Sequence, residues 1–286
     1  MSDISELLKG VYDLHVHTAP SAHARYLDDV ELLLLMDQAG MGGATIKSHY
    51  ECTASRAMIA NKYFHTKAKL YGCLSLNQTV GGWNPSAVDF ALQMGTKNIF
   101  APTNHAKSFM ERSKSDEARY KIRCREPLTL LDENGAIRPE VFEILDLVRL
   151  YDAILQTGHL SETEGALLAK EALSRHIRTV ITHPDSPSTR YPMELQLELA
   201  KAGAMIDISY RSVQMNRIGI EELVSHVHAL SPERCIVTTD LGQKSVGFSP
   251  VEGYGKMIEL LLQNGINEKE IRIMTAENPG QLLGVS

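Results

Sequence analysis

Two histidines separated by one residue stand near the start of the chain, in the segment Asp13-Leu-His15-Val-His17. In an extended strand successive side chains point to opposite faces, so Asp13, His15 and His17 are expected on the same face. Neutral imidazole nitrogens are good ligands for divalent metals such as zinc. The pair therefore indicates a metal site, although surface or packing histidines can have the same spacing.

Further side chains of the kind that bind metals follow three other apolar runs. His159 comes after Ile154-Leu-Gln-Thr-Gly, His183 comes after Val180-Ile-Thr, and Asp240 comes after Ile236-Val-Thr-Thr. Unpaired imidazoles and carboxylates are costly to bury, so core packing is a poor explanation for all of them. If the runs are parallel strands of a barrel, their carboxyl ends meet at one mouth.

Short apolar or β-branched runs alternate with helical patterns along the chain, as in repeated βα units with a parallel sheet. The runs expected to be strands are Val11–His17, Gly43–Lys47, Lys69–Leu76, Asn98–Ala101, Ala153–Gly158, Thr179–Thr182, Ala204–Ile208 and Cys235–Thr239. Helices are expected at Leu27–Gln38, after the capping boxes Ser161–Glu164 and Asn267–Glu270, and from Asn278. The fold class predicted is α/β, a (β/α)8 TIM barrel in which residues 1–286 form one domain.

One region interrupts this alternation, from about residue 104 to residue 150. It contains a charged stretch, Lys107 to Glu126, and the turn-forming segment Asp132-Glu-Asn-Gly135 between apolar runs, which predicts a hairpin. We interpret it as an insertion after strand four, at the end of the barrel where active sites lie. It would serve as a lid or substrate wall, or else as a solvated excursion or an oligomer contact.

With these residues in place, the chain resembles the amidohydrolase superfamily of metal-dependent hydrolases, which have a (β/α)8 barrel with His-x-His on strand one. The tail Met274-Thr-Ala-Glu-Asn-Pro-Gly-Gln-Leu-Leu-Gly is similar to the closing segment of that family. The resemblance implies that the metal ligands are His15, His17, His159, His183 and Asp240. It also implies that Asp240 moves the proton of the reacting water, with one or two ions of zinc or a similar divalent metal as cofactor.

Strand four departs from the family pattern, because many members have a carboxylated lysine or a glutamate there and this chain has Pro102-Thr-Asn104-His105. Lys47, at the end of the second strand, could reach the same mouth. It is interpreted as a metal ligand carrying a carbamate, as an anchor for a charged substrate, or as a surface lysine.

Three further residues are candidates for substrate binding: His49, His105 and Arg211. Their positions after strands suit a pocket lining. Each histidine could instead bind a second metal or be structural, and the arginine could grip an anionic substrate or form a surface salt bridge.

Composition excludes several classes of protein. The 29 basic and 35 acidic residues give a net charge of −6 with no basic run, which argues against nucleic-acid binding. No apolar run approaches the roughly 20 residues that span a bilayer, so we expect a cytoplasmic protein without membrane partners. Cys52, Cys73, Cys124 and Cys235 form no Cys-x-x-Cys pair and are expected to be reduced. A homo-oligomer is left open.

The expected function is hydrolysis of a small-molecule amide, lactam, lactone or ester by metal-activated water, and a metal-dependent decarboxylase on the same scaffold is left open. Two other readings compete with it. A phosphoesterase of the PHP type also begins with His-x-His but needs more acidic ligands than these strand ends offer. A non-catalytic metal- or ligand-binding barrel would hold metal without turnover.

Overall fold

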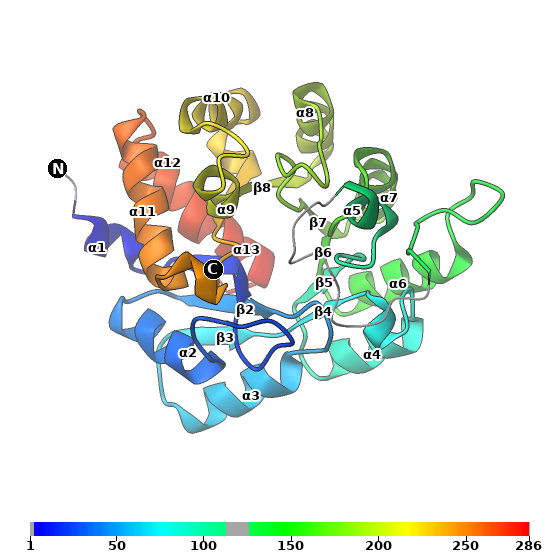
Figure 1. The fold of residues 1–286 in the computed structure, drawn as a ribbon, viewed down its shortest axis with the longest axis horizontal. Helices are drawn as coiled ribbons and strands as arrows, with labels where there is room; N and C mark the ends of the chain where they lie inside the picture. Colours follow the sequence, from blue (N-terminus) through cyan, green and yellow to red (C-terminus); the bar gives the residue numbers. More distant parts are fainter. Residues whose placement is uncertain (1–2, 113–125, 286) are drawn as a thin grey trace. The chain divides into compact units, whose positions relative to one another are not determined.

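The computed structural model of the chain describes residues 3–112 and 126–285 (Figure 1). Most of the predicted charged stretch, together with Cys124, lies outside the described residues. The described chain forms two compact units. The first lies within Met1–Lys47, Ser55–Gly72 and Asp207–Ser286, and the second within Ser48–Ala54 and Cys73–Ile206. The expectation of a single domain over residues 1–286 stays a prediction.

In the first unit, three parallel strands follow one another in the order β1-β2-β3. Strand β9 runs beside β1 and beside the end of β8, which belongs to this unit from Asp207 onward. The elements of this unit are α1 (Ile4–Leu8), β1 (Tyr12–His17), α2 (Asp29–Gln38), β2 (Gly43–Lys47), α3 (Ala54–Tyr63), β3 (Lys69–Tyr71), α9 (Tyr210–Gln214), α10 (Ile220–Leu230), β9 (Cys235–Thr238), α11 (Pro250–Gln263), α12 (Glu268–Arg272) and α13 (Asn278–Leu283).

In the second unit, the strands β4, β5, β6 and β7 pair in parallel in that order, and β8 pairs with β7 through Met205 and Ile206. Side chains such as Leu74, Ile99 and Leu155 form its buried core. The elements of this unit are β4 (Cys73–Ser75), α4 (Pro85–Gln93), β5 (Asn98–Phe100), α5 (Lys107–Arg112), α6 (Pro139–Leu150), β6 (Ile154–Gln156), α7 (Glu162–Ser174), β7 (Arg178–Ile181), α8 (Met193–Ala202) and β8 (Met205–Ser209).

The run predicted as one strand over Lys69–Leu76 is two strands in the structure. β3 pairs with β2, whereas β4 pairs with β5. At the break the Cys73 N–H donates to Thr53 Oγ1, and the Cys73 carbonyl accepts from the Thr53 N–H. The backbone groups of this residue are therefore shared with a loop, which local apolar patterning cannot reveal.

Helix ends follow the sequence signals with one exception. The box Asn267–Glu270 is complete at the start of α12, and Asp28 forms a further box with Glu31 at the start of α2. At α7, Ser161 accepts from the Glu164 N–H, but the Glu164 carboxylate accepts from the Leu130 N–H instead of the Ser161 backbone. A tertiary hydrogen bond therefore replaces one of the two hydrogen bonds of the expected capping box.

The predicted insertion is shorter than expected, because its last part is the helix α6 between β5 and β6. This helix buries Val141, Ile144, Leu145 and Val148 and packs against α4. The predicted hairpin is a tight turn in which Asp132 N–H donates to the Ala136 carbonyl, closed by a single antiparallel bridge between Leu131 and Ile137. The irregular part of the region thus ends before Pro139.

The cysteines that the structure describes, Cys52, Cys73 and Cys235, are free thiols, as predicted. Within residues 3–112 and 126–285, every helix is too short or too polar to cross a bilayer.

Candidate metal centre

The first unit gathers His15, His17 and Asp240 into one cluster. One side-chain donor atom from each lies within 4.8 Å of the others. Asp240 Oδ1 lies 3.1 Å from His15 Nε2 and 3.1 Å from His17 Nε2. Both imidazoles are almost fully buried. The two histidines predicted to share one face of β1 and the aspartate predicted at a strand end therefore lie together within this unit.

Backbone bonds between β1 and the segment after β9 hold Asp240 in place. The Asp240 N–H donates to the His15 carbonyl at 2.9 Å, and the His17 N–H donates to the Leu241 carbonyl at 2.8 Å. The backbone of Asp240 has φ 52°, in the left-handed region that a non-glycine residue rarely adopts. Such conformations cluster at functional sites, where the surrounding structure enforces them.

Two groups contact His17 Nδ1. The Lys47 carbonyl oxygen, which can only accept, lies 3.1 Å away, and a guanidinium nitrogen of Arg25, which can only donate, lies 3.4 Å away. The shorter contact favours a hydrogen on Nδ1. His17 Nε2 then presents a lone pair, and it faces an oxygen of Asp240 at 3.1 Å. Two acceptors this close are satisfied by a cation between them. The donor set of imidazole and carboxylate therefore fits a divalent metal ion.

The electrostatics of His17 and Asp240 agree with this donor set. Burial lowers the pKa of His17 well below its ordinary value, so the ring is neutral, as a metal ligand must be. Burial by itself would raise the pKa of Asp240, but the neighbouring His15 and His17 hold that pKa well below its ordinary value. Asp240 is therefore a carboxylate.

Lys47 belongs to the same cluster. It ends β2, where it is paired in register with His17. Its Nζ lies 2.8 Å from His15 Nε2, and the residue is only 2% exposed. Of the three readings of this lysine, the surface one is ruled out by burial, while the carbamate and the substrate anchor stay open.

Two buried carboxylates in this unit had no role in the sequence-based interpretation. Asp207, in β8, accepts from Thr238 Oγ1 at 2.6 Å and has an oxygen 3.9 Å from His15 Nδ1. Asp13 accepts from the N–H groups of His15 and Thr239 and from Thr239 Oγ1. The sequence signal that could have identified them is that each carboxylate lies within an apolar strand. A carboxylate is costly to bury there unless it has hydrogen-bond partners of this kind.

Arg211, a predicted substrate-binding residue, lies in α9 of the same unit. Its N–H donates to the carbonyl of Thr239, the residue before Asp240, and its guanidinium donates to Gln214 Oε1. The side chain is 7% exposed. Its role toward a substrate stays a prediction.

The second unit gathers the remaining predicted histidines. The rings of His159 and His183, which follow β6 and β7, have centroids 5.0 Å apart, and the ring of His49 is 5.8 Å from that of His159. The His159 carbonyl accepts from Ser108 Oγ at 2.6 Å. These three predicted residues are therefore neighbours within one unit.

His105 has a contact that suits the structural reading. Its Nδ1 accepts the N–H of Gln78 at 3.0 Å and so supports the turn after β4. Burial lowers the pKa of its imidazole. A neutral acceptor role is consistent with both observations, and substrate binding by His105 stays a prediction.

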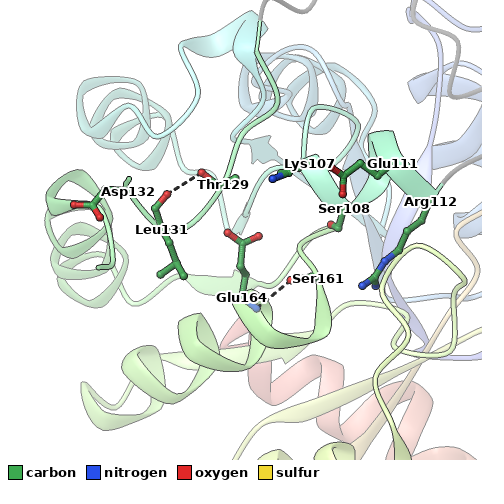
Figure 2. A pocket seen from close by; sticks show the side chains of 9 residues that line it. All are labelled: Lys107, Ser108, Glu111, Arg112, Thr129, Leu131, Asp132, Ser161 and Glu164. Atoms are coloured by element: carbon green, nitrogen blue, oxygen red, sulfur yellow. Dashed lines mark hydrogen bonds between the residues drawn. The ribbon is translucent and has the colours of Figure 1, made fainter. Parts of the chain in front are cut away.

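A pocket of about 360 Å³ lies elsewhere in the second unit (Figure 2). It is lined by Lys107, Ser108, Glu111, Arg112, Thr129, Leu131, Asp132, Ser161 and Glu164. Burial raises the pKa of Glu164, although the Leu130 N–H opposes that shift. None of the lining residues was a predicted site residue, and Ser108 connects the pocket to the backbone of His159.

Residues 10–207 match a family described as a family of unknown function, DUF6282. The chain belongs to the DUF6282 family. The matched range of this DUF6282 protein includes His15, His17, Lys47, His159 and His183 and ends before Asp240. None of the curated proteins compared with the chain matches it.

Solved structures similar to this DUF6282 protein span nearly its whole length. An amidohydrolase from Pseudomonas aeruginosa is 12% identical with a TM-score of 0.66, and the match covers 99% of this chain and 98% of the other. A putative 2-pyrone-4,6-dicarboxylic acid hydrolase from Pseudomonas putida is 13% identical, with a TM-score of 0.60 and coverage of 97% and 98%. A 2,6-dihydroxybenzoate decarboxylase is 12% identical, with a TM-score of 0.56 and coverage of 96% and 99%.

At these identities the likeness shows the fold. The DUF6282 protein has the α/β, (β/α)8-barrel fold that these solved structures share, and the predicted fold class is confirmed. Because hydrolases and a decarboxylase share the fold, the reaction must be argued from the site.

Proposed function

We propose that this protein is a metal-dependent hydrolase that acts on a small-molecule amide, lactam, lactone or ester. The observation that carries the proposal is the cluster of His15, His17 and Asp240, in which His17 Nε2 and a carboxylate oxygen of Asp240 lie 3.1 Å apart. That arrangement supports a site for a divalent cation, with zinc as the expected ion.

When bound, such an ion would lower the pKa of a water molecule and polarise a carbonyl group. The residues of the chain supply the remaining requirements. His15 and His17 would be ligands held by β1, and the Lys47 carbonyl contacts the His17 ring. The ionised Asp240 has the basic oxygen that accepts the proton from the reacting water and returns it to the leaving group.

His159 and His183 are also proposed as metal ligands. Their support is their positions directly after β6 and β7 and the adjacency of their rings in the second unit. Loss of bound metal in the His159→Ala and His183→Ala variants is the expected result. Unchanged metal content in both would remove them from the ligand set.

The experiment that tests the function combines metal analysis of the purified protein with a panel of lactones, lactams, amides and aryl esters. We expect about one to two equivalents of zinc or a similar ion per chain, and turnover of a member of the panel. The variant with both His15→Ala and His17→Ala should lose metal and activity. His65→Ala, at an exposed position of the same unit, is the matched control and should keep both.

Each other outcome identifies a different function. Retained metal in the double variant would refute the site. Bound metal without turnover would identify a binding barrel, and release of phosphate from aryl phosphates would favour a phosphoesterase.

Decarboxylation is a second candidate, because a 2,6-dihydroxybenzoate decarboxylase is among the structures that share the fold. Release of carbon dioxide from aromatic carboxylic acids, without hydrolysis of the panel, would support it.

A further inference from the structure

A chain of three side chains in the second unit defines the protonation of His49. Asn77 Oδ1 accepts the backbone N–H groups of Thr103 and His105, both at 3.0 Å. Because an N–H can only donate, the oxygen and nitrogen of this amide are assigned without ambiguity. Asn77 Nδ2 is therefore a donor.

Asn77 Nδ2 has two acceptors. It donates to the His49 carbonyl at 2.7 Å and to Thr103 Oγ1 at 2.6 Å. The Thr103 hydroxyl thus accepts from Asn77, and its own hydrogen needs another acceptor. Within the described part of the chain, the remaining contact of Thr103 Oγ1 is His49 Nδ1 at 2.8 Å.

Burial makes this assignment energetically significant. Asn77 and Thr103 are both 0% exposed. A buried hydroxyl hydrogen without an acceptor costs about 1–3 kcal/mol. If His49 Nδ1 carried a hydrogen, it would donate that hydrogen to Thr103 Oγ1. The hydroxyl hydrogen of Thr103 would then have no acceptor. The Thr103 hydroxyl therefore donates to Nδ1, and the neutral ring has its hydrogen on Nε2.

His49 lies beside a proposed metal ligand, where a hydrogen-bond donor could act on a substrate. Its ring lies edge-on to that of His159, a proposed metal ligand, at 5.8 Å, and edge-on to that of Tyr50 at 6.0 Å. An imidazole whose Nδ1 is engaged by a hydroxyl cannot act as a base through that atom, and its Nε2–H is a hydrogen-bond donor.

We infer that Thr103 and Asn77 are positioning residues that hold His49 as an Nε2–H donor toward a carbonyl or carboxylate oxygen of the substrate. The role toward substrate rests on the proposed hydrolase function, whereas the tautomer does not. His49 would then stabilise negative charge that develops on that oxygen, as donors in an oxyanion hole do.

The tautomer is measured by two-bond ¹H–¹⁵N correlation spectra of the full-length protein labelled with ¹⁵N-histidine, with the His49 signals assigned by their loss in His49→Gln. We expect the Nε2–H form in the wild type and in Thr103→Ser, which keeps the hydroxyl. Thr103→Val should abolish the preference. An Nδ1–H or doubly protonated His49 in the wild type would overturn the inference, even if the valine variant does not fold.

The role toward substrate is measured by kcat/KM on the first substrate that the lactone, amide and ester panel yields. His49→Ala should lower kcat/KM by about 10²- to 10³-fold, as loss of one such donor does. The glutamine amide in His49→Gln can replace the Nε2–H donor but not an acid–base group, so it should recover most of that loss. A glutamine variant as inactive as the alanine variant would overturn the donor role. A protein inert to the panel but with the Nε2–H tautomer would refute the proposed function while supporting the tautomer.

Discussion

At the scale of single residues, Asp240 meets the requirements of a metal ligand and of a proton acceptor, because its carboxylate contacts both histidines of β1 and is ionised. Asp240→Asn keeps the shape but removes the basic oxygen. We expect kcat/KM to fall by about 10²- to 10⁴-fold, the usual cost of losing a general base. Asp152→Asn, whose native side chain is 83% exposed, is the matched control. Wild-type kcat/KM in Asp240→Asn would mean that the proton is accepted elsewhere.

Lys47 is the second residue whose chemistry can be tested directly. It is buried beside His15, and a carbamate forms from the neutral amine, which burial favours over the ammonium. A carbamate would supply the anion that two divalent ions about 3.5–4 Å apart require. We expect Lys47→Ala to lose metal and activity, with partial recovery when a short carboxylic acid is added.

The carbamate itself is detected by ¹³C NMR after incubation with ¹³C-bicarbonate. A bare amine in the wild type, together with full metal content in Lys47→Ala, would leave the substrate anchor as the remaining reading of this lysine.

At the scale of elements, Arg56 of α3 fixes the segment that leads from β1 into α2. Its guanidinium donates to both oxygens of Asp29 at 2.7 and 2.8 Å and to the Ala19 carbonyl at 3.0 Å. Both side chains of the ion pair are less than 15% exposed. Arg56→Ala leaves a buried carboxylate without its partner and should lower the free energy of unfolding by about 3–5 kcal/mol.

Urea denaturation measures this loss. The variant with both Arg56→Met and Asp29→Leu removes both charges and should recover much of it. A double variant that is as unstable as Arg56→Ala would show that the segment depends on the hydrogen bonds and not on charge balance.

Asp13 links β1 to the end of β9 through a hydrogen bond from Thr239. Burial raises the pKa of Asp13 to about 7, although the hydrogen bonds from Thr239 and His15 act to lower that pKa. A carboxyl group with a raised folded-state pKa binds its proton more tightly in the folded protein. Its contribution to stability therefore falls as pH rises from about 4 to about 7. Asp13→Asn keeps the two N–H bonds and removes this titration.

We expect the difference in unfolding free energy between Asp13→Asn and the wild type, measured on chelator-treated protein, to favour the variant more at pH 8 than at pH 5. The change should be on the order of 1–3 kcal/mol. An equal difference at the two pH values would contradict the raised pKa.

At the scale of the whole molecule, a metal that binds only the folded chain must raise its thermal stability. At a free metal concentration of 100 times Kd the gain is about 2.7 kcal/mol. For domains of about 150–250 residues, 1 kcal/mol of stability shifts Tm by roughly 2–4 °C. Applied to this slightly longer chain, that relation predicts a Tm rise on the order of 5–10 °C with zinc. Calorimetry of the chelated protein with and without zinc measures it. A similar rise in the His15→Ala/His17→Ala variant would place the metal elsewhere.

The sequence by itself was sufficient for the fold class and for the positions of several candidate site residues in the strands, because the patterns involved are local. Strand alternation puts His15 and His17 on one side of β1, and a polar residue directly after an apolar run marks a strand end whatever the rest of the chain does. The split between β3 and β4 was not predictable in this way, because the chain pairs there with Thr53, about 20 residues earlier, through its hydroxyl and its N–H.

The tertiary structure alone determined what each side chain contacts. Lys47 meets His15 across 32 positions of sequence, His17 meets Asp240 across 223, and Asn77 meets Thr103 across 26. A hydrogen bond requires donor and acceptor within about 3.2 Å, and residue spacing along a chain does not give that distance. The hydrogen positions on His17 and His49, on which their chemistry depends, are likewise argued from long-range contacts, with the Lys47 carbonyl and the Thr103 hydroxyl.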